Sequence, residues 1–237
     1  MSLSRLFLIG LLCFATPIRS DEGNSATGKT PASEKEPALL PIQADPRLPQ
    51  VLLIGDSISI GYTLPVREIF KGRANIHRPL INGGATPRGV QGLDTWLGDT
   101  KWDVIHFNWG LHDLKYVDGK QNIPPAEYEK NLCAIVARLQ KTGATLIWAS
   151  TTPVPKGISS PKARVSEDVV IYNEIAARVM KENNIAIDDL YAFALPRLVE
   201  IQIPANVHYT KEGSEVLAGQ VAASIEDALK NRPAKSP

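Results

Sequence analysis

The stretch Val51-Leu52-Leu53-Ile54-Gly55-Asp56-Ser57-Ile58-Ser59 decides the fold of this chain. Its unbroken apolar run with β-branched members is typical of a strand buried on both faces of a parallel sheet. Gly55-Asp56-Ser57 predicts an abrupt turn from this strand into a helix, at the sheet edge where open α/β folds bind ligands. The helix would direct free N–H groups and its positive dipole end at Ser57. Ser57 is therefore a candidate nucleophile, the alternative being that Asp56 or Ser57 only caps the helix.

Beyond this strand, apolar segments of strand length alternate with amphipathic segments of helix length. Further strands are expected near 75–77, 102–108, 144–150 and 185–187. Pro65 suits the first turn of a helix running to about Lys71, a loop comes after Gly110, and more helices are expected at 90–97, 125–141, 166–181, 190–198 and 211–229. This alternation predicts parallel strands joined by right-handed crossovers, and hence a three-layer α/β/α sandwich with a central parallel sheet. We expect one such domain at 49–230, with a disordered tail at 231–237.

The first twenty residues have the features of a secretory signal peptide. Residues 1–5 are short and basic, residues 6–14 are apolar, and the small residues Ala15 and Ser20 offer cleavage points. The apolar run is too short to span a bilayer. We therefore expect a secreted or periplasmic protein with a signal peptide at 1–20 and no membrane span. Residues 21–48 are rich in Pro, Ala, Ser, Thr and Glu, which predicts a disordered linker.

The composition argues against several other classes of protein, and one motif that suggests a nucleotide site is misleading. The net charge of +1 gives no reason to expect nucleic acid or an acidic membrane as a partner. Residues 23–30 match the phosphate-binding pattern G-x-x-x-x-G-K-[ST], but no strand precedes them, and Pro31 and Pro37 prevent a helix after them. No nucleotide site or cofactor is expected. Without the leader, Cys133 is the one remaining cysteine, which excludes an intramolecular disulfide and predicts a small buried or boundary thiol.

Ser57 needs a neighbouring base, because a serine hydroxyl is a poor nucleophile until its proton is removed. Imidazole suits this task at neutral pH, and the chain has four histidines. His77 and His106 lie within or beside apolar strand segments and are expected to be structural. His208 and His112 lie in loops at the ends of elements, where sites are commonly built.

An attacking serine also needs donors for the oxyanion that forms on the substrate. We expect the first donor to be the Ser57 N–H at the helix start. Gly84, in Asn82-Gly83-Gly84-Ala85-Thr86, allows close backbone approach and is the second candidate, although glycines here also fit ordinary turn chemistry. The segment 107–113 offers a side chain as the third donor.

These motifs, in this order, resemble the SGNH or GDSL-type hydrolase superfamily over roughly 50–229. The resemblance implies a flavodoxin-like α/β/α fold and ester hydrolysis by the serine of Gly-Asp-Ser. Gly55-Asp56-Ser57 matches the first block of the family, and Gly84 is the best candidate for the second-block glycine. Gly110-Leu111-His112-Asp113 lies where the family usually has Gly-x-Asn-Asp, and His208 matches the histidine of the last block.

The third block departs from the family pattern. The asparagine that normally donates to the oxyanion is here His112, whose imidazole N–H could serve, with Asp113 fixing its orientation. Asn108 at the end of the strand could substitute. A metal site from His106, His112 and Asp113 is not expected, because alternation along a strand and loop does not make them converge.

The last block departs more seriously, because Ala205 stands where the family's triad acid usually lies, three residues before His208. An acid that orients the imidazole is worth about 10⁴ in turnover in a serine protease. Asn206 could accept a hydrogen bond from His208 through its amide oxygen, and a backbone carbonyl could do the same. Either arrangement leaves a Ser-His dyad.

The resemblance and the leader together lead to a functional expectation. We expect an exported serine ester hydrolase that removes small acyl (acetyl) groups from carbohydrate esters. Its partner is then a small-molecule or carbohydrate ester. The alternative, motivated by Ala205, is a catalytically weak or inactive hydrolase-fold protein that acts as a carbohydrate-binding module.

Overall fold

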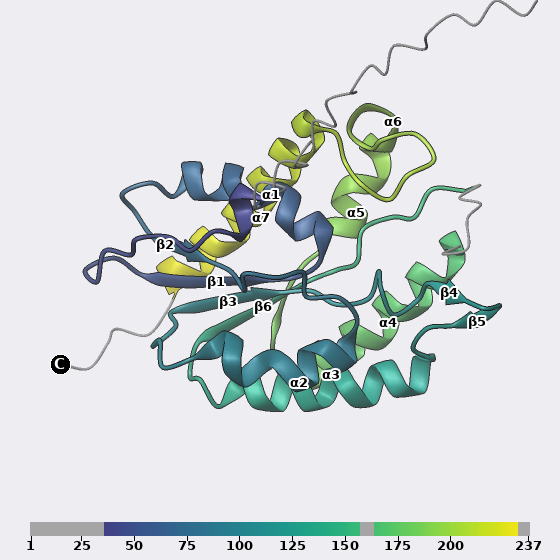
Figure 1. The fold of residues 1–237 in the computed structure, drawn as a ribbon, viewed down its shortest axis with the longest axis horizontal. Coiled ribbons are helices and arrows are strands. Elements are labelled where there is room, and N and C mark those ends of the chain that lie inside the picture. The colour runs from purple at the N-terminus through teal and green to yellow at the C-terminus, as the bar shows by residue number, and fades with distance from the viewer. Residues whose placement is uncertain (1–35, 157–163, 232–237) are drawn as a thin grey trace, which may run out of the picture. The chain divides into compact units, whose positions relative to one another are not determined.

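The computed structural model describes residues 36–156 and 164–231 (Figure 1). The expected signal peptide at 1–20, the phosphate-loop pattern at 23–30 and all but the first residue of the tail at 231–237 lie outside these described residues. The expectations for those segments stay predictions.

A single parallel sheet organises the domain, as the alternating pattern predicted. Its five strands are β1 (Gln50–Ile54), β2 (Asn75–His77), β3 (Val104–Phe107), β6 (Thr145–Ala149) and β7 (Ala186–Asp188), in the order β2-β1-β3-β6-β7. Every neighbouring pair is parallel, and Val51 of β1 lies opposite Ile76 of β2 and Val104 of β3. Strand β1, which lies between β2 and β3, is fully buried from Val51 to Ile54, which explains its unbroken apolar sequence.

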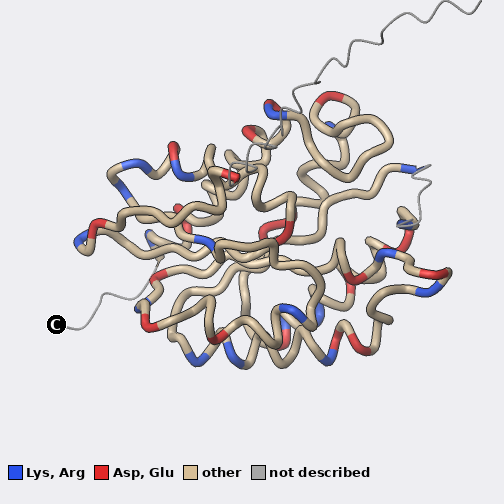
Figure 2. The backbone as a smooth tube through the Cα atoms, viewed as in Figure 1, with Lys and Arg blue, Asp and Glu red and all other residues tan. Residues whose placement is uncertain are grey.

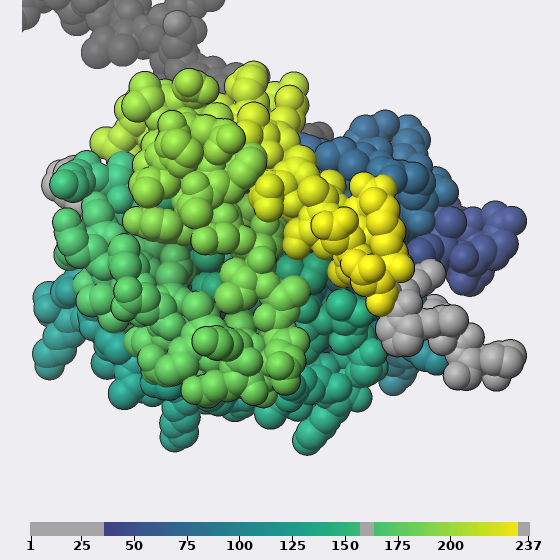
Figure 3. All heavy atoms as spheres, turned by 180° about the vertical axis from the view of Figure 1, so that it is seen from behind, coloured from purple at the N-terminus to yellow at the C-terminus, as the bar shows by residue number. Residues whose placement is uncertain are grey.

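Helices cover both faces of this sheet (Figure 1), which confirms the three-layer α/β/α sandwich. One face carries α1 (Ser57–Ile69) and the long α7 (Lys211–Asn231), which pack against each other. The opposite face carries α2 (Thr86–Leu97), α3 (Pro125–Gln140) and α4 (Ser166–Glu182) in sequential contact. In the view from behind, α7, coloured yellow, runs along the surface of the molecule (Figure 3).

The helix after β1 starts earlier than the position of Pro65 predicted. α1 begins at Ser57, and Pro65 lies inside it. Asp56 fixes this start, because its side chain accepts a hydrogen bond from the Ile58 N–H at 2.9 Å. The local preference of proline for a first turn was therefore overridden by a capping residue well upstream of it.

Two regions between the main elements also differ from expectation. The expected loop after Gly110 contains a short antiparallel hairpin of β4 (Tyr116–Val117) and β5 (Lys120–Gln121). Asp118 and Gly119 form its turn with positive φ angles of 51° and 75°. The expected single helix at 190–198 is divided into α5 (Leu190–Ala194), η2 (Leu195–Arg197) and α6 (Leu198–Ile201).

The last part of the expected linker packs against the domain. A short 3₁₀ helix, η1 (Pro37–Leu39), buries Ala38 completely. Asp45 exchanges two hydrogen bonds with Asn75 of β2, at 3.0 Å and 2.7 Å. The prediction of a disordered linker over 21–48 is therefore wrong for residues 36–48. A few apolar and turn residues are enough to order a short segment when it can pack against the surface of the folded domain.

The surface carries both signs of charge, with basic and acidic residues interspersed along the chain (Figure 2). Within the described part of the chain, none of the helices combines the length and the apolar character needed to cross a membrane. Cys133 on α3 is exposed, so the expectation of a buried or boundary thiol is wrong.

Candidate active site

Ser57 and His208 meet at the carboxyl edge of the sheet, although 151 residues separate them in the sequence. Ser57 Oγ lies 2.9 Å from His208 Nε2. Asp56, not Ser57, caps α1, so the hydroxyl is left to face the imidazole. The first N–H groups of a helix have no acceptor within it, and the Ser57 N–H is the first of α1.

Asn206 holds His208 from the other side. Asn206 Oδ1 accepts the backbone N–H of His208 at 3.0 Å and lies 2.7 Å from His208 Nδ1. A backbone N–H can only donate, so the Asn206 atom facing it is the amide oxygen. His208 Nδ1 must then carry the proton it donates to this oxygen, which leaves a lone pair on Nε2 to accept the Ser57 hydroxyl proton.

The loop that carries these two residues is folded back on itself. The Ile203 N–H donates to the His208 carbonyl at 3.0 Å, and the Asn206 N–H donates to the Ile203 carbonyl at 3.1 Å. Ala205 adopts a left-handed φ of 52°, which makes the reversal. Gly213 of α7 permits close approach of this loop, because a Cβ there would lie 2.0 Å from the Ile201 carbonyl oxygen.

The second-block glycines lie against the nucleophile turn. The Gly83 N–H donates to the Gly55 carbonyl at 2.9 Å, and a Cβ on Gly83 would meet that oxygen at 2.8 Å. Gly84 has a positive φ of 61°, and its N–H donates to Asn82 Oδ1 at 2.9 Å. The amide expected as an oxyanion donor is thus held by Asn82, and it is released only when this side chain turns away.

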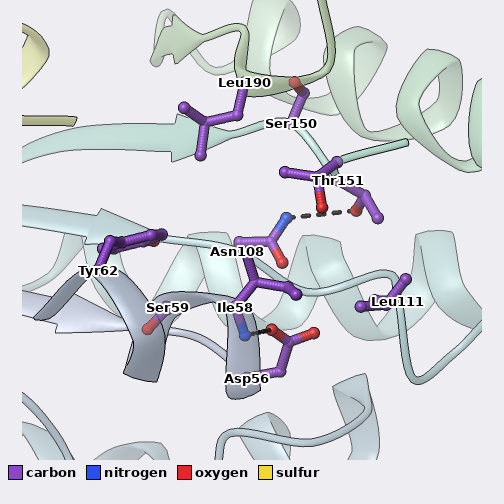
Figure 4. Close-up of a pocket in the computed structure, with 10 residues that line it drawn as sticks. Asp56, Ile58, Ser59, Tyr62, Asn108, Leu111, Ser150, Thr151 and Leu190 are labelled. Atoms are coloured by element: carbon purple, nitrogen blue, oxygen red, sulfur yellow. Dashed lines mark hydrogen bonds between the residues drawn. The ribbon is translucent and has the colours of Figure 1, made fainter. Parts of the chain in front are cut away.

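The geometry favours His112 over Asn108 as the third donor. Asn108 Nδ2 donates to the Ala149 carbonyl at 2.8 Å. It also donates to Thr151 Oγ1 at 3.2 Å (Figure 4). Both amide hydrogens of Asn108 are therefore occupied in tying β3 to β6. His112 is half-buried and lines the same pocket as Gly84.

The pKa of His112 is lowered, first by burial and then by the nearby cations of Arg164, Lys115 and Arg88, against the opposing effect of Asp56. A lowered pKa favours the neutral imidazole, which has one N–H donor and adds no charge of its own.

Asp113 does not orient His112 as expected. Its Oδ1 accepts hydrogen bonds from both the backbone N–H and the hydroxyl of Thr86 at the start of α2. Asp113 is fully buried and its Oδ2 has no partner among the described residues. Burial raises its pKa to about 7, against the lowering effect of the Thr86 hydrogen bonds. Asp113 therefore links the segment after Gly110 to the start of α2, which follows Gly84.

The remaining histidines have structural partners, in line with their strand positions. His106 Nε2 lies 3.0 Å from Asp188 Oδ2 in a fully buried pair, and Gln220 donates to the other oxygen of Asp188 at 2.9 Å. His77 Nε2 lies 2.8 Å from Gln50 Oε1. Among the residues that the structure describes, no group of three or more His, Cys, Asp or Glu side chains is placed to hold a metal ion.

Arg78 supports the nucleophile turn and was not found from the sequence. It is 5% exposed, and its Nη1 donates to Thr63 Oγ1 at 2.8 Å and to Ser59 Oγ at 3.1 Å. Its Nη2 donates to the Gly55 carbonyl at 3.3 Å. Burial lowers its pKa to about 10, which still leaves it charged at neutral pH. No motif marks this residue, because its partners come from another element.

Known proteins with the same architecture share this arrangement of elements. The lipase/acylhydrolase from Enterococcus faecalis is 20% identical, with a TM-score of 0.66 over 79% of this chain and 100% of that one. The acetyl xylan esterase AlAXEase is 20% identical, with a TM-score of 0.63 over 74% of this chain and 99% of that one. Axe2, an acetylxylan esterase from Geobacillus stearothermophilus, is 17% identical, with a TM-score of 0.63 over 78% and 97%. At these identities the likeness establishes the fold.

The family is established by a match of the sequence to a family model. A search of curated proteins, by contrast, found no match. The model of the GDSL-like lipase/acylhydrolase family matches residues 53–216, which include the Gly-Asp-Ser turn, both glycines of the second block, the Gly110 segment and His208. The chain therefore belongs to the GDSL-like lipase/acylhydrolase family of SGNH hydrolases.

Proposed function

We propose that this protein is an exported serine ester hydrolase that removes small acyl groups, above all acetyl, from carbohydrate esters. The observation that carries the proposal is the hydrogen-bonded chain from Ser57 Oγ through the imidazole of His208 to Asn206 Oδ1. This series of hydrogen bonds joins a nucleophile, a base of the correct tautomer and a group that orients the base.

Catalysis proceeds through an acyl-enzyme. Ser57 Oγ attacks the ester carbonyl carbon as its proton passes to His208 Nε2, and a tetrahedral oxyanion forms. The carbon–oxygen bond to the alcohol then breaks, and the imidazolium gives its proton to the leaving alkoxide. His208 next takes a proton from water, the hydroxide attacks the acyl-enzyme, and Ser57 recovers its proton as the acid leaves.

The oxyanion is held by the Ser57 N–H, the His112 imidazole and the Gly84 N–H once Asn82 releases it. Each donor of this kind is worth about 10²–10³ in turnover. Asn206 orients the imidazole without a negative charge, so it stabilises the imidazolium less than a carboxylate would. The proposal is therefore of a modest esterase.

The substrate class and the export rest on separate support. Two of the proteins that share the fold are named as acetyl xylan esterases, which favours a small acyl group on a carbohydrate. The basic and apolar leader at 1–20 supports export. Export predicts that the protein isolated from outside the cytoplasm has lost this leader, which N-terminal sequencing of the purified protein checks.

Hydrolysis of p-nitrophenyl acetate by the full chain, with and without Ser57→Ala, tests the catalytic part. We expect the substitution to lower kcat at least about 10³-fold. Ser214→Ala, on the neighbouring α7, is the matched control and should retain the wild-type rate. Equal rates in wild type and Ser57→Ala, or failure of the wild type to react with a fluorophosphonate, would instead favour the binding-module alternative.

A further inference from the structure

A basic pocket adjoins the oxyanion side of the site. It has a volume of about 400 Å³, and Gly84 and His112 line it together with Arg88 and Lys115. The described residues around it include these two cationic side chains and no Asp or Glu. Such a lining favours a ligand that carries negative charge.

Arg88 is placed beside the second-block glycine by close packing. Arg88 is exposed on the first turn of α2, and its Nη1 donates to the Asn82 carbonyl at 3.2 Å. Its side chain lies over Gly84, where an added Cβ would be 3.4 Å from Nε and 3.7 Å from Cζ of Arg88. The guanidinium charge therefore lies next to the backbone that approaches the nucleophile turn.

The charges on the elements around the pocket reinforce this polarity. Arg164 donates to the Leu111 carbonyl at 2.8 Å and brings a further cation to the His112 side. Of the two nearby carboxyls, Asp56 caps α1 and opposes the effect of the cations of Arg164, Lys115 and Arg88 on His112. The other, Asp113, is only partly ionised at neutral pH, because burial raises its pKa to about 7. Cationic groups thus outnumber ionised carboxylates around His112.

We propose that this pocket binds a carboxylate of the substrate, so that the enzyme prefers esters bearing a negative charge close to the scissile bond. This inference rests on the proposed ester hydrolysis. A guanidinium binds a carboxylate through two parallel hydrogen bonds, which fixes both position and orientation. The carboxylate can belong to the alcohol part, as in a uronic acid, or to the acyl part, as in a hemisuccinate.

Two pairs of matched esters distinguish these sources. The alcohol side is tested with 4-carboxyphenyl acetate against its methyl ester, and the acyl side with 4-nitrophenyl hydrogen succinate against its methyl ester. In each pair, kcat/KM is divided by the second-order rate constant for hydrolysis by hydroxide, because the free carboxylate of the succinate accelerates its own uncatalysed hydrolysis. We expect one charged ester to be preferred about tenfold or more, because hydrogen bonds to a charged group are stronger than those between neutral groups. The preference should shrink when salt is raised to about 0.5 M.

Variants assign this preference to the pocket. Arg88→Gln should abolish the preference, mainly through KM, and Arg88→Lys should restore part of it because it keeps the charge but loses the paired donors. Arg178→Gln is the control, since this exposed arginine pairs with Glu129 on the far helices α3 and α4. A wild type that hydrolyses charged and neutral esters alike would overturn the inference and leave the esterase proposal standing.

Binding tests the pocket independently of turnover. The non-hydrolysable amides 4-acetamidobenzoate and N-phenylsuccinamate, each compared with its methyl ester, are titrated into Ser57→Ala by calorimetry. We expect one charged amide to bind at least tenfold more tightly than its neutral partner, and Arg88→Gln to remove the difference. Equal binding within both pairs would overturn the inference even if no ester were hydrolysed.

Discussion

Asn206 Oδ1 lies 2.7 Å from His208 Nδ1 and occupies the place that an acid has in a serine triad. The usual acid position, Ala205, has a left-handed φ of 52° and is exposed. This turn brings the next side chain, Asn206, back towards His208, so that its amide contacts the imidazole from two residues away. Ser57, His208 and Asn206 therefore form one hydrogen-bonded series, which we propose acts as a triad rather than as a dyad.

Removing the Asn206 amide should impair turnover. We expect Asn206→Ala to lower kcat about 10- to 100-fold, because the imidazole loses the contact that selects its tautomer. Asn206→Asp should raise kcat above wild type, since a carboxylate keeps both acceptor contacts and adds charge that stabilises the imidazolium. Steady-state kinetics on p-nitrophenyl acetate measure both. An unchanged kcat in Asn206→Ala would show that a different group orients His208.

Restoring an acid at the family position should bring no gain. The N–H at His208 Nδ1 already donates to Asn206, so the new carboxylate of Ala205→Asp would find no free N–H at this position to accept. Aspartate tolerates the left-handed conformation, so the fold should be retained. We expect kcat within about twofold of wild type, checked alongside circular dichroism. A large increase would mean that the Asn206 contact does little in catalysis.

His112 and Asn108 should separate into a catalytic and a structural role. His112→Ala should lower kcat about 10²-fold with little change in KM, because an oxyanion contact acts mainly in the transition state. Asn108→Ala should instead lower the free energy of unfolding by about 1–3 kcal/mol, since it leaves the Ala149 carbonyl without its donor. Kinetics and urea denaturation of both variants test the division, which fails if Asn108→Ala alone loses turnover.

Asp113 should make the stability of the protein depend on pH. Burial raises its pKa from 3.8 to about 7, so between these values the folded state binds a proton that the unfolded state has released. The free energy of unfolding contributed by this group therefore falls as the pH rises from about 4 to about 7. Asp113→Asn keeps the acceptor for Thr86 and cannot ionise.

The difference in free energy of unfolding between variant and wild type should consequently grow in favour of Asp113→Asn from about pH 5 to about pH 8. Urea denaturation at these two pH values measures it. A constant difference would show that Asp113 stays ionised throughout this range.

Two glycines of α7 provide a matched test of close packing. Gly213→Ala should destabilise the fold by about 1–3 kcal/mol, because its Cβ would lie 2.0 Å from the Ile201 carbonyl oxygen and displace the His208 loop. Gly219→Ala in the same helix meets nothing within 4 Å and should stabilise the protein by up to about 1 kcal/mol. Thermal denaturation compares the two. Similar shifts in both would indicate that the loop accommodates the methyl group.

The sequence by itself determined the architecture and singled out Ser57 and His208, the two side chains that we propose react. The apolar run 51–54 can be satisfied only between two covered faces, and its alternation with helix-length segments dictates a parallel sheet. The order of the Gly-Asp-Ser turn, the glycines, the Gly110 segment and His208 pointed to the family.

Only the tertiary structure decided what surrounds those side chains. The contact between Ser57 and His208, the use of both Asn108 hydrogens by β6, and the support of Gly55 by Arg78 all join separate elements. Local sequence patterns report the conformational preferences of neighbouring residues. They do not report which distant donor and acceptor share a hydrogen bond, since that depends on how the elements pack and which polar groups packing leaves without water.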